Sequence, residues 1–431
     1  MTSGHRPNGA AEALPGRRMP RVLRQFLETE AAGGIVLVVA AAVALVWANS
    51  PWDGSYRALW ETDLTLGLGR WAHTEDLRHW VNDALMTLFF FVVGLEIKRE
   101  LVRGDLRDPR VAALPAIAAL GGMVVPALLY LAVVGGSEGS RGWGIPMATD
   151  IAFAMGILAL LGGRVPSALK LFLLTLAIVD DIGAIVVIAV FYAGDLNTAY
   201  LGGAVALLAA MVVLRRAGII WMAPYLVLGA AVWVLTLASG VHATIAGVAL
   251  GLITPAVPMT PGSVAREWAG DLSDEPSPDE LAAMTRLAQT SVSPAERLQH
   301  QLHPWSSFLV VPVFALANAG VAIGGDGPVR VTAAVVLGLV VGKTVGITAA
   351  SWLAIRLGLA RLPEGVGWAM VVGTGAVAGI GFTVSLFVAE LAFEAGTVQD
   401  AAKVGVLAAS VLAAALGSLL VATASRRRPA A

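Results

Sequence analysis

Long apolar stretches separated by short polar connections recur along nearly the whole chain. A helix needs about 20 mostly apolar residues to cross the hydrocarbon core of a bilayer, so we interpret these stretches as transmembrane helices. The pattern predicts twelve of them, at residues 31–49, 82–101, 111–134, 145–162, 168–192, 198–214, 219–238, 241–254, 306–323, 331–357, 366–391 and 401–424. We therefore expect an all-α polytopic membrane protein with a single transmembrane domain over residues 31–424.

The composition agrees with this interpretation and excludes several classes of protein. The chain is 57% hydrophobic and only 14% charged, with a mean hydropathy of +0.77, whereas soluble domains carry about 25% charged residues. Its net charge of −1 gives no reason to expect a nucleic-acid partner. The absence of cysteine excludes disulfides, thiol catalysis and cysteine metal sites. Without a Walker sequence, a Rossmann fingerprint or a soluble catalytic domain, we expect neither an enzyme, nor a cofactor, nor ATP-driven transport.

The basic residues indicate how the chain lies in the membrane. Lys and Arg gather in cytoplasmic loops close to the ends of membrane helices. Alternate connections carry most of them, namely Lys98, Arg99, Arg103, Arg107 and Arg110, then Arg164 and Lys170, then Arg215 and Arg216, then Arg356 and Arg361. The N-terminal arm, residues 1–30, and the tail, residues 425–431, are also basic. This bias predicts an inner-membrane protein with both termini in the cytoplasm.

Two connections are unusually long. Residues 50–80 form an external segment with Trp, His and mixed charge, for which we expect a surface hairpin. Residues 255–305 form the longest cytoplasmic loop, which is rich in Pro and acids and is expected to be solvated and partly disordered. Its acidic residues include Glu267, Asp271, Asp274, Glu275, Asp279 and Glu280.

Four ionisable residues lie inside apolar stretches, where a charge costs several kcal/mol and by default indicates function. They are Asp150, Asp180, Asp181 and Lys343. Adjacent residues of an α-helix point about 100° apart, so one of the two neighbouring aspartates can line an ion cavity while the other meets Lys343. The alternative is a buried salt bridge that only fixes helix register. Three acids with one lysine would leave an acid uncompensated, which disfavours that alternative.

These groups suit exchange of a hard cation for protons. Na⁺ and Li⁺ prefer oxygen ligands, and the carboxylates, Thr149 and freed backbone carbonyls could supply them. A carboxylate in a low-dielectric site can hold a proton near neutral pH and lose it when a cation arrives. Competition of H⁺ and the cation for the same oxygens is sufficient for exchange.

Two apolar stretches combine Gly or Pro with Thr, at residues 144–150 and 373–383. Interrupted helices are tolerated at membrane depth where they line a cavity, and a pair of them points to a transporter site. Asp150 would offset the positive N-terminal ends of half-helices, and Lys343 the negative C-terminal ends. The alternative, that the glycines only allow close packing, is weakened by the central charges.

Eight short motifs resemble the NhaA-type Na⁺/H⁺ antiporter family. They follow the family's order from about residue 25 to residue 420, and together they are specific. The motifs are Asn82–Met86, Val93–Leu101, Ala148–Ala154, Ala177–Ala184, Ser239–Thr244, Leu302–Trp305, Ala317–Val321 and Gly379–Thr383.

The resemblance implies a fold and a set of residue roles. It implies twelve transmembrane helices in two inverted repeats, whose fourth and eleventh helices are interrupted and cross near the midplane. It also implies electrogenic exchange of two protons for one Na⁺ or Li⁺. Asp181 matches the principal cation ligand and proton carrier, and Asp180 matches its neighbour, so both are expected to bind the cation transiently. Asp180 would also pair with Lys343, and Asp150 and Thr149 match the crossing.

The resemblance further implies a cytoplasmic funnel that senses pH. Its matching residues are Glu96, Arg99, Glu100, Arg297 and His300, together with His242 near a helix end. The alternative for residues 96–100 is a solvated helix end with ordinary positive-inside charges. Residues 296–300 depart from the family pattern, so the activation pH is not carried over. Relatives often dimerise through an external hairpin, which residues 50–80 could supply.

Two other classes compete with this interpretation. An intramembrane aspartyl protease needs a Gly-x-Gly-Asp setting within a span, which this sequence lacks, and Lys343 would disrupt a proton-sharing pair. A Na⁺-coupled organic-anion symporter also uses crossed broken helices, but it needs polar side chains for its substrate, and few are present. The direction of proton flux distinguishes exchange from co-transport.

Overall fold

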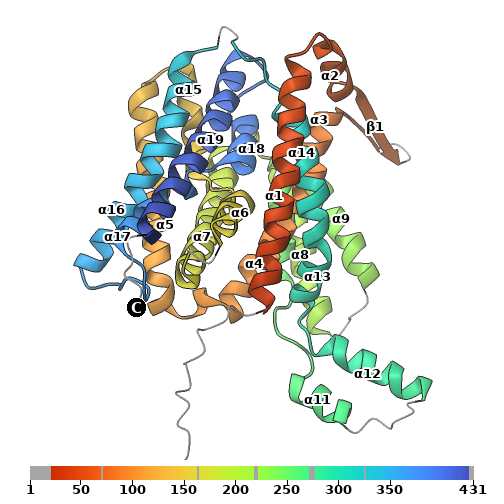
Figure 1. The fold of residues 1–431 in the computed structure, drawn as a ribbon. Coiled ribbons are helices and arrows are strands. Elements are labelled where there is room, and N and C mark those ends of the chain that lie inside the picture. Colours follow the sequence, from red (N-terminus) through yellow and green to blue (C-terminus); the bar gives the residue numbers. More distant parts are fainter. Residues whose placement is uncertain are drawn as a thin grey trace, which may run out of the picture.

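The computed structural model describes residues 21–68, 71–162, 165–217, 222–270, 277–324 and 327–426, and these form a bundle of upright helices. A small β-hairpin lies at one end of the bundle, and two short helices project from the other end (Figure 1). Residues 1–20 of the predicted N-terminal arm and residues 427–431 of the predicted basic tail lie outside the described residues.

The first half of the chain alternates long helices with short connections. Its elements are α1 (Arg21–Ala48), α2 (Asp53–Trp60), β1 (Asp63–Leu68), β2 (Trp71–Asp76), α3 (Leu77–Trp80), η1 (Val81–Leu85), α4 (Met86–Arg103), η2 (Asp105–Arg107), α5 (Pro109–Val134), η3 (Glu138–Met147), α6 (Ile151–Leu160), α7 (Ser167–Phe191) and α8 (Thr198–Arg216).

The second half begins with shorter helices and ends with a long one. Its elements are α9 (Met222–Ala238), α10 (Thr244–Ile253), α11 (Gly262–Gly270), α12 (Pro278–Thr290), α13 (Pro294–Trp305), η5 (Ser306–Val310), α14 (Val311–Asn318), α15 (Val329–Val336), η6 (Leu337–Gly342), α16 (Lys343–Arg356), α17 (Trp368–Ala378), α18 (Phe382–Ala392) and α19 (Thr397–Arg426).

Many of these helices can cross a membrane. Within the described residues, six segments are long and apolar enough, at Leu77–Arg103, Pro109–Val134, Ser167–Phe191, Thr198–Arg216, Val329–Arg356 and Thr397–Ser425. Bent helix pairs raise the number to as many as nine. Each of the twelve predicted spans coincides with helix, but those at 219–238, 241–254 and 306–323 do not meet the same criterion of length and composition. The chain is thus an α-helical polytopic membrane protein.

Both predicted interruptions are present. The chain leaves the helical path between η3 and α6, and again between α17 and α18, and each pair of helices is bent by 46°. Pro146 lacks the N–H that a continuous helix would use. At the second break, a Cβ on Gly379 would lie 2.3 Å from the carbonyl oxygen of Leu339, so glycine is required for this close approach to η6.

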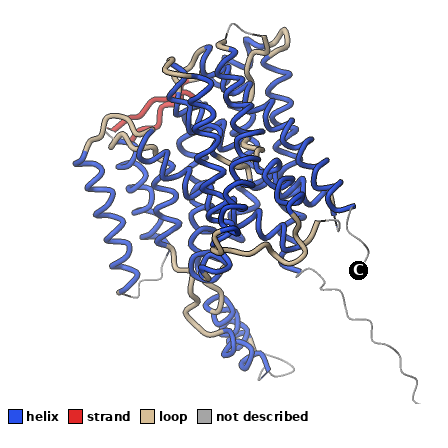
Figure 2. The backbone as a smooth tube through the Cα atoms, turned by 90° about the vertical axis from the view of Figure 1, so that its left-hand side faces the viewer, coloured by secondary structure: helices blue, strands red, loops and turns tan. Residues whose placement is uncertain are grey.

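The connection at residues 50–80 contains a β-hairpin, as the sequence predicts. Strands β1 and β2 pair antiparallel, with Asp63 opposite Asp76 and Leu68 opposite Trp71. The Thr65 and Thr74 hydroxyls are 2.8 Å apart across the pair. In Figure 2 the hairpin lies at the end of the bundle away from the projecting helices, beside the helix ends.

The acidic connection at 255–305 is more regular than the sequence predicts. It contains α11, α12 and α13, and only Asp271, Asp274 and Glu275 of its acids lie outside the described residues. A capping box between Ser277 and Glu280 begins α12. The expectation of a solvated and partly disordered loop does not hold for α13, which is a helix that packs against α4 and buries Ala295 and Gln299. The prediction rested on the acidic composition of the segment and did not take these helix-capping residues into account.

Close backbone packing fixes the helix that carries Lys343. A Cβ on Gly121 of α5 would lie 2.3 Å from the carbonyl oxygen of Gly346 on α16, one turn beyond Lys343. Small residues allow membrane helices to approach in this way. The free energy of their association comes from van der Waals packing, because the hydrophobic effect does not drive helices together in lipid. Helix α16 is therefore held against α5 at the level of the buried lysine.

We predict that Gly121→Ala destabilises the protein. The added methyl group must push α5 away from α16, which costs about 1–3 kcal/mol in a packed interior, so thermal unfolding in detergent should begin at a lower temperature. Gly202→Ala on α8 is the matched control, because a Cβ there meets nothing within 4 Å. Equal melting temperatures for the two variants would contradict this account of the α5–α16 contact.

Candidate functional site

The two interrupted helices meet at their breaks. The Asp150 N–H donates to the Ile380 carbonyl at 2.7 Å, and the Thr149 hydroxyl lies 3.0 Å from the Ala378 carbonyl oxygen. Helix ends leave backbone N–H and C=O groups without intrahelical partners. Each break therefore provides hydrogen-bonding partners for backbone groups that the other break leaves unpaired. Backbone and side-chain hydrogen bonds together hold the two breaks against each other.

Asp150 caps two half-helices at once. Its Oδ1 accepts from the Phe153 N–H of α6 at 3.0 Å. Its Oδ2 accepts from the Thr383 N–H of α18 at 3.2 Å and from the Thr383 hydroxyl at 2.7 Å. A carboxylate is stabilised at the positive N-terminal end of a helix, and here one carboxylate serves two such ends. Asp150 thus has a clear structural role at the crossing.

A buried ion pair lies beside this crossing. The Lys343 ammonium contacts Asp180 Oδ2, and both side chains have no exposed surface. Lys343 Nζ also donates to the Thr149 hydroxyl at 2.5 Å, and that hydroxyl lies 2.7 Å from Asp180 Oδ2. Burying two charges costs several kcal/mol for each ion, and only close pairing with further hydrogen bonds offsets it. Thr149 links this pair to the broken helices.

Asp181 differs from its neighbour on α7. Among the described residues, no hydrogen bond joins its carboxylate to another group, although it lies in the electrostatic field of Asp180, Glu96 and Lys343. Its residue is 6% exposed, whereas Asp180 is fully buried. On α7, the Asp180 carboxylate thus contacts the lysine, whereas the Asp181 carboxylate is free to take up a proton or a cation.

A second charged group lies at the far end of α4. Arg99 bonds to Glu100 at 3.0 Å and approaches Glu96 at 4.0 Å. It also donates to the Gln299 side-chain oxygen of α13 at 3.1 Å. The Glu96 and Glu100 side chains are only 13% and 14% exposed, which is less than a solvated helix end would show. Arg297 is half-buried and His300 exposed on the same helix α13.

His242 does not join this group. Gly247 of α10 packs on Thr87 of α4, and Gly251 packs on Gly94, so the two helices run parallel. His242 precedes α10 and therefore lies at the end opposite Glu96. Its Nε2 is 2.6 Å from the Tyr192 carbonyl oxygen.

Several residues of the site were not singled out from the sequence. Thr383 belongs to a quoted motif, but its bond to Asp150 depends on a contact across 233 positions. Ser410 of α19 accepts from the Phe382 N–H at 3.3 Å and so caps α18 from outside. Gln299 stands between Arg297 and His300 in the sequence, and only its burial in the structure distinguishes it from other polar residues of α13.

The geometry allows ion exchange chemistry. Two adjacent carboxylates, one paired and one open, lie beside a lysine and beside backbone carbonyls released by the broken helices. Oxygen donors of this kind suit hard monovalent cations, and each of the two carboxylates can also carry a proton.

Comparison with known proteins gives consistent matches over nearly the whole chain. The family described as "Na+/H+ antiporter 1" matches residues 24–421. A Na(+)/H(+) antiporter NhaA of Rhodopirellula baltica is 48% identical over 418 residues, which cover 94% of this chain and 95% of that protein. One of Acidovorax sp. is 48% identical over 430 residues, covering 97% of each. Another, from Sorangium cellulosum, is 46% identical over 431 residues, covering 93% of this chain and 90% of that protein.

We predict that Thr383→Val weakens the crossing. The substitution keeps the shape and the N–H but removes the hydroxyl that donates to Asp150, which leaves a buried acceptor short of a partner at a cost of about 1–3 kcal/mol. The melting temperature and the exchange rate should both fall. Thr374→Val is the control, since that hydroxyl donates only to the Met370 carbonyl of its own helix. An equal loss in both variants would contradict a special role for the Asp150 contact.

Proposed function

The chain belongs to the Na⁺/H⁺ antiporter 1 family, and we propose that as such an antiporter it exports Na⁺ or Li⁺ in exchange for entering protons at Asp181. The observation that carries the site assignment is the contrast between two adjacent carboxylates. Asp180 is held by Lys343 and Thr149, whereas Asp181 has no hydrogen-bonding partner among the described residues. A carboxylate without a fixed partner is the one that can alternate between proton and cation.

The proposed cycle uses both acids and the lysine. A cation that binds Asp181 displaces its proton and reaches toward Asp180, which then releases the Lys343 ammonium. Without its carboxylate, a buried ammonium is unfavourable and loses a proton. Two protons therefore leave for one cation, which makes the exchange electrogenic. Thr149 bonds to the Asp180–Lys343 pair and to the Ala378 carbonyl, so breaking the pair pulls on both interrupted helices.

The same proposal gives the membrane arrangement its finer detail. We infer twelve spans in two inverted repeats, with the interrupted helices crossing near the midplane of a bacterial inner membrane. The positive-inside bias of the connections supports cytoplasmic termini. On this orientation, the β-hairpin and α2 are external and α11–α13 are cytoplasmic. A homodimer through residues 50–80 is part of the proposal, and the exposed Leu64 and Leu66 of β1 support it.

A Na⁺-coupled organic-anion symporter gains no support. The relatives reported above are all named Na⁺/H⁺ antiporters, and the described residues around Asp181 offer carboxylates rather than a surface for a bulky anion. The direction of proton flux on addition of Na⁺ under an imposed pH gradient would distinguish exchange from co-transport.

We predict that Asp181→Asn abolishes exchange. An amide can neither carry the exchanged proton nor attract a cation as a carboxylate does. In everted vesicles, NaCl or LiCl should collapse an imposed pH gradient for the wild type between about pH 6.5 and about pH 8.5, and KCl should not. Asp195→Asn, the same change at an exposed loop position, should behave as the wild type.

Either of two results would contradict this proposal. Exchange that persists in Asp181→Asn would move the site elsewhere while leaving the function intact. A wild type that moves no protons when Na⁺ or Li⁺ is added would remove the proposed function itself.

We propose in addition that Glu96, Arg99 and Glu100, with Arg297 and His300 nearby on α13, regulate exchange by pH, and that His242 acts separately from the opposite end.

Gln299→Leu removes an acceptor from Arg99, so Arg99 pairs more fully with the two carboxylates. The contacts of the two carboxylates change with it, so the pH of half-maximal exchange should shift by about half a unit. Gln301→Leu, at an exposed position of α13, is the control. A pH profile that is unchanged in Gln299→Leu would count against the cluster.

A further inference from the structure

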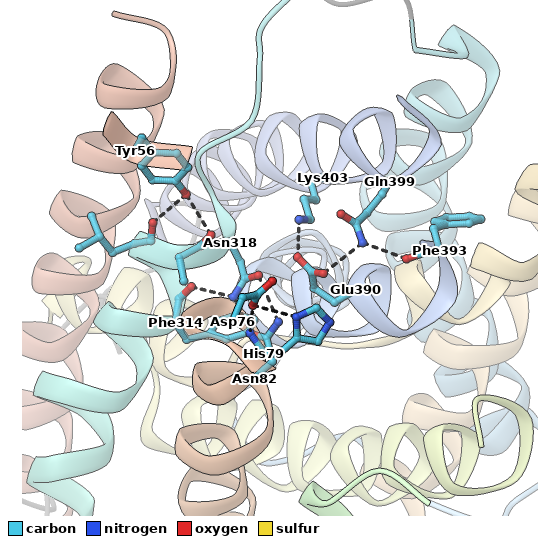
Figure 3. A network of polar contacts seen from close by, with 12 residues as sticks. Tyr56, Asp76, His79, Asn82, Phe314, Asn318, Glu390, Phe393, Gln399 and Lys403 are labelled. Carbon is cyan, nitrogen blue, oxygen red and sulfur yellow. Dashed lines mark hydrogen bonds and ion pairs between the residues drawn. The ribbon is translucent and has the colours of Figure 1, made fainter. Parts of the chain in front are cut away.

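A second buried ion pair lies near the hairpin end of the bundle. Glu390 of α18 contacts Lys403 of α19, and the two side chains are 12% and 3% exposed. Gln399 donates from Nε2 to Glu390 Oε2 at 3.1 Å and to the Phe393 carbonyl at 2.9 Å. Figure 3 shows the three side chains converging from the two helices.

This pair has the same design as the central one. In each, a lysine meets a carboxylate, and a neutral side chain contacts both that carboxylate and a backbone carbonyl. Thr149 does so for Asp180 and Ala378, and Gln399 does so for Glu390 and Phe393. A pair needed only to join α18 to α19 could be apolar at no loss of stability. A charged pair buried among apolar helices is therefore a candidate for function.

The position of Glu390 relates it to the exchange site. It follows Thr383 by seven residues on α18, so the two lie on the same face, about two turns apart. Phe387 lies between them. Its ring centroid is 5.4 Å from that of Phe90 on α4 and 6.2 Å from that of Phe314 on α14, and all three are buried. Glu390 is therefore on the hairpin side of an aromatic layer that lies above the crossing.

Other oxygen-bearing side chains are present on that side. Asn318 of α14 donates to the Asn82 side-chain oxygen of η1 at 2.7 Å, and both residues are buried. Asn318 follows Phe314 by four residues and Asn82 precedes Phe90 by eight, so this amide pair also lies on the hairpin side of the aromatic layer (Figure 3). The Tyr56 hydroxyl of α2 lies 2.9 Å from the carbonyl oxygens of Leu316 and Ala317 at the same end of α14. The hairpin side of the aromatic layer thus holds the Glu390 carboxylate and two side-chain amides.

We propose that Glu390 is an outer binding station for the transported Na⁺ or Li⁺, between the aromatic layer and the external solution. Lys403 neutralises the carboxylate when no cation is present, as Lys343 does for Asp180. A cation that has passed the layer replaces the ammonium at Glu390 and then leaves to the outside. This inference rests on the proposed exchange at Asp181 and on the proposed orientation.

The test measures cation affinity separately from the two faces. Everted vesicles present the cytoplasmic face to added NaCl, and right-side-out vesicles present the external face, each with proton flux followed by a pH-sensitive dye. For Glu390→Gln we expect the apparent KM for Na⁺ to rise about tenfold from the external face, as for loss of one charge-assisted contact. From the cytoplasmic face it should change less than about twofold.

Two further variants separate binding from support of the fold. Glu394→Gln, an exposed neighbour, should match the wild type from both faces. The double variant Glu390→Gln with Lys403→Gln leaves no unpaired buried charge and can keep an amide–amide bond, so it should fold even if the single variant does not. It should still show the external defect.

Several outcomes would overturn the outer station. Equal changes from both faces, or no change from either, would make the pair structural. A double variant with the external KM of the wild type would do the same. Loss of exchange in the wild type itself would instead contradict the proposed function, so the two failures are distinguishable.

Discussion

A fully buried lysine ammonium is the constraint around which this protein is organised. Lys343 has no exposed surface, and such a charge persists only when a carboxylate and further hydrogen-bonding groups meet it. Asp180 supplies the carboxylate, and Thr149 supplies the hydroxyl from within a helix that has been interrupted to bring it there. The break, in turn, needs a second break opposite it to satisfy its backbone groups. Glycine contacts between α5 and α16 hold the helix that carries the lysine in place.

The charged members of the site could be predicted because they contradict their surroundings. Asp150, Asp180, Asp181 and Lys343 stand out as ionisable groups in apolar stretches, and membrane burial makes such residues costly enough to be informative. The interruptions were also visible, because Gly and Pro together with Thr are poor choices for an uninterrupted apolar helix. The hairpin followed from its polar composition between two long helices.

The partners of those residues could not be predicted, since they depend on contacts between distant segments. The sequence gives no sign that Ala378 would offer its carbonyl to Thr149, or that Asp150 would cap α18 as well as α6. Gln299 carries the link from α13 to Arg99, yet it differs little from any polar residue of a helix. The acidic segment at 255–305 misled in the other direction, because net charge suggested disorder while Ser277 and Ser293 began helices.

The aromatic layer formed by Phe90, Phe314 and Phe387 has a consequence for energy conservation. A narrow apolar constriction excludes water, and a chain of water molecules is what lets protons run freely through a pore. The three buried rings lie between the central carboxylates and the hairpin end, where they oppose the formation of such a chain of water molecules. A polar side chain at this level would admit water and open a path for protons that bypasses the exchange of Na⁺ for H⁺.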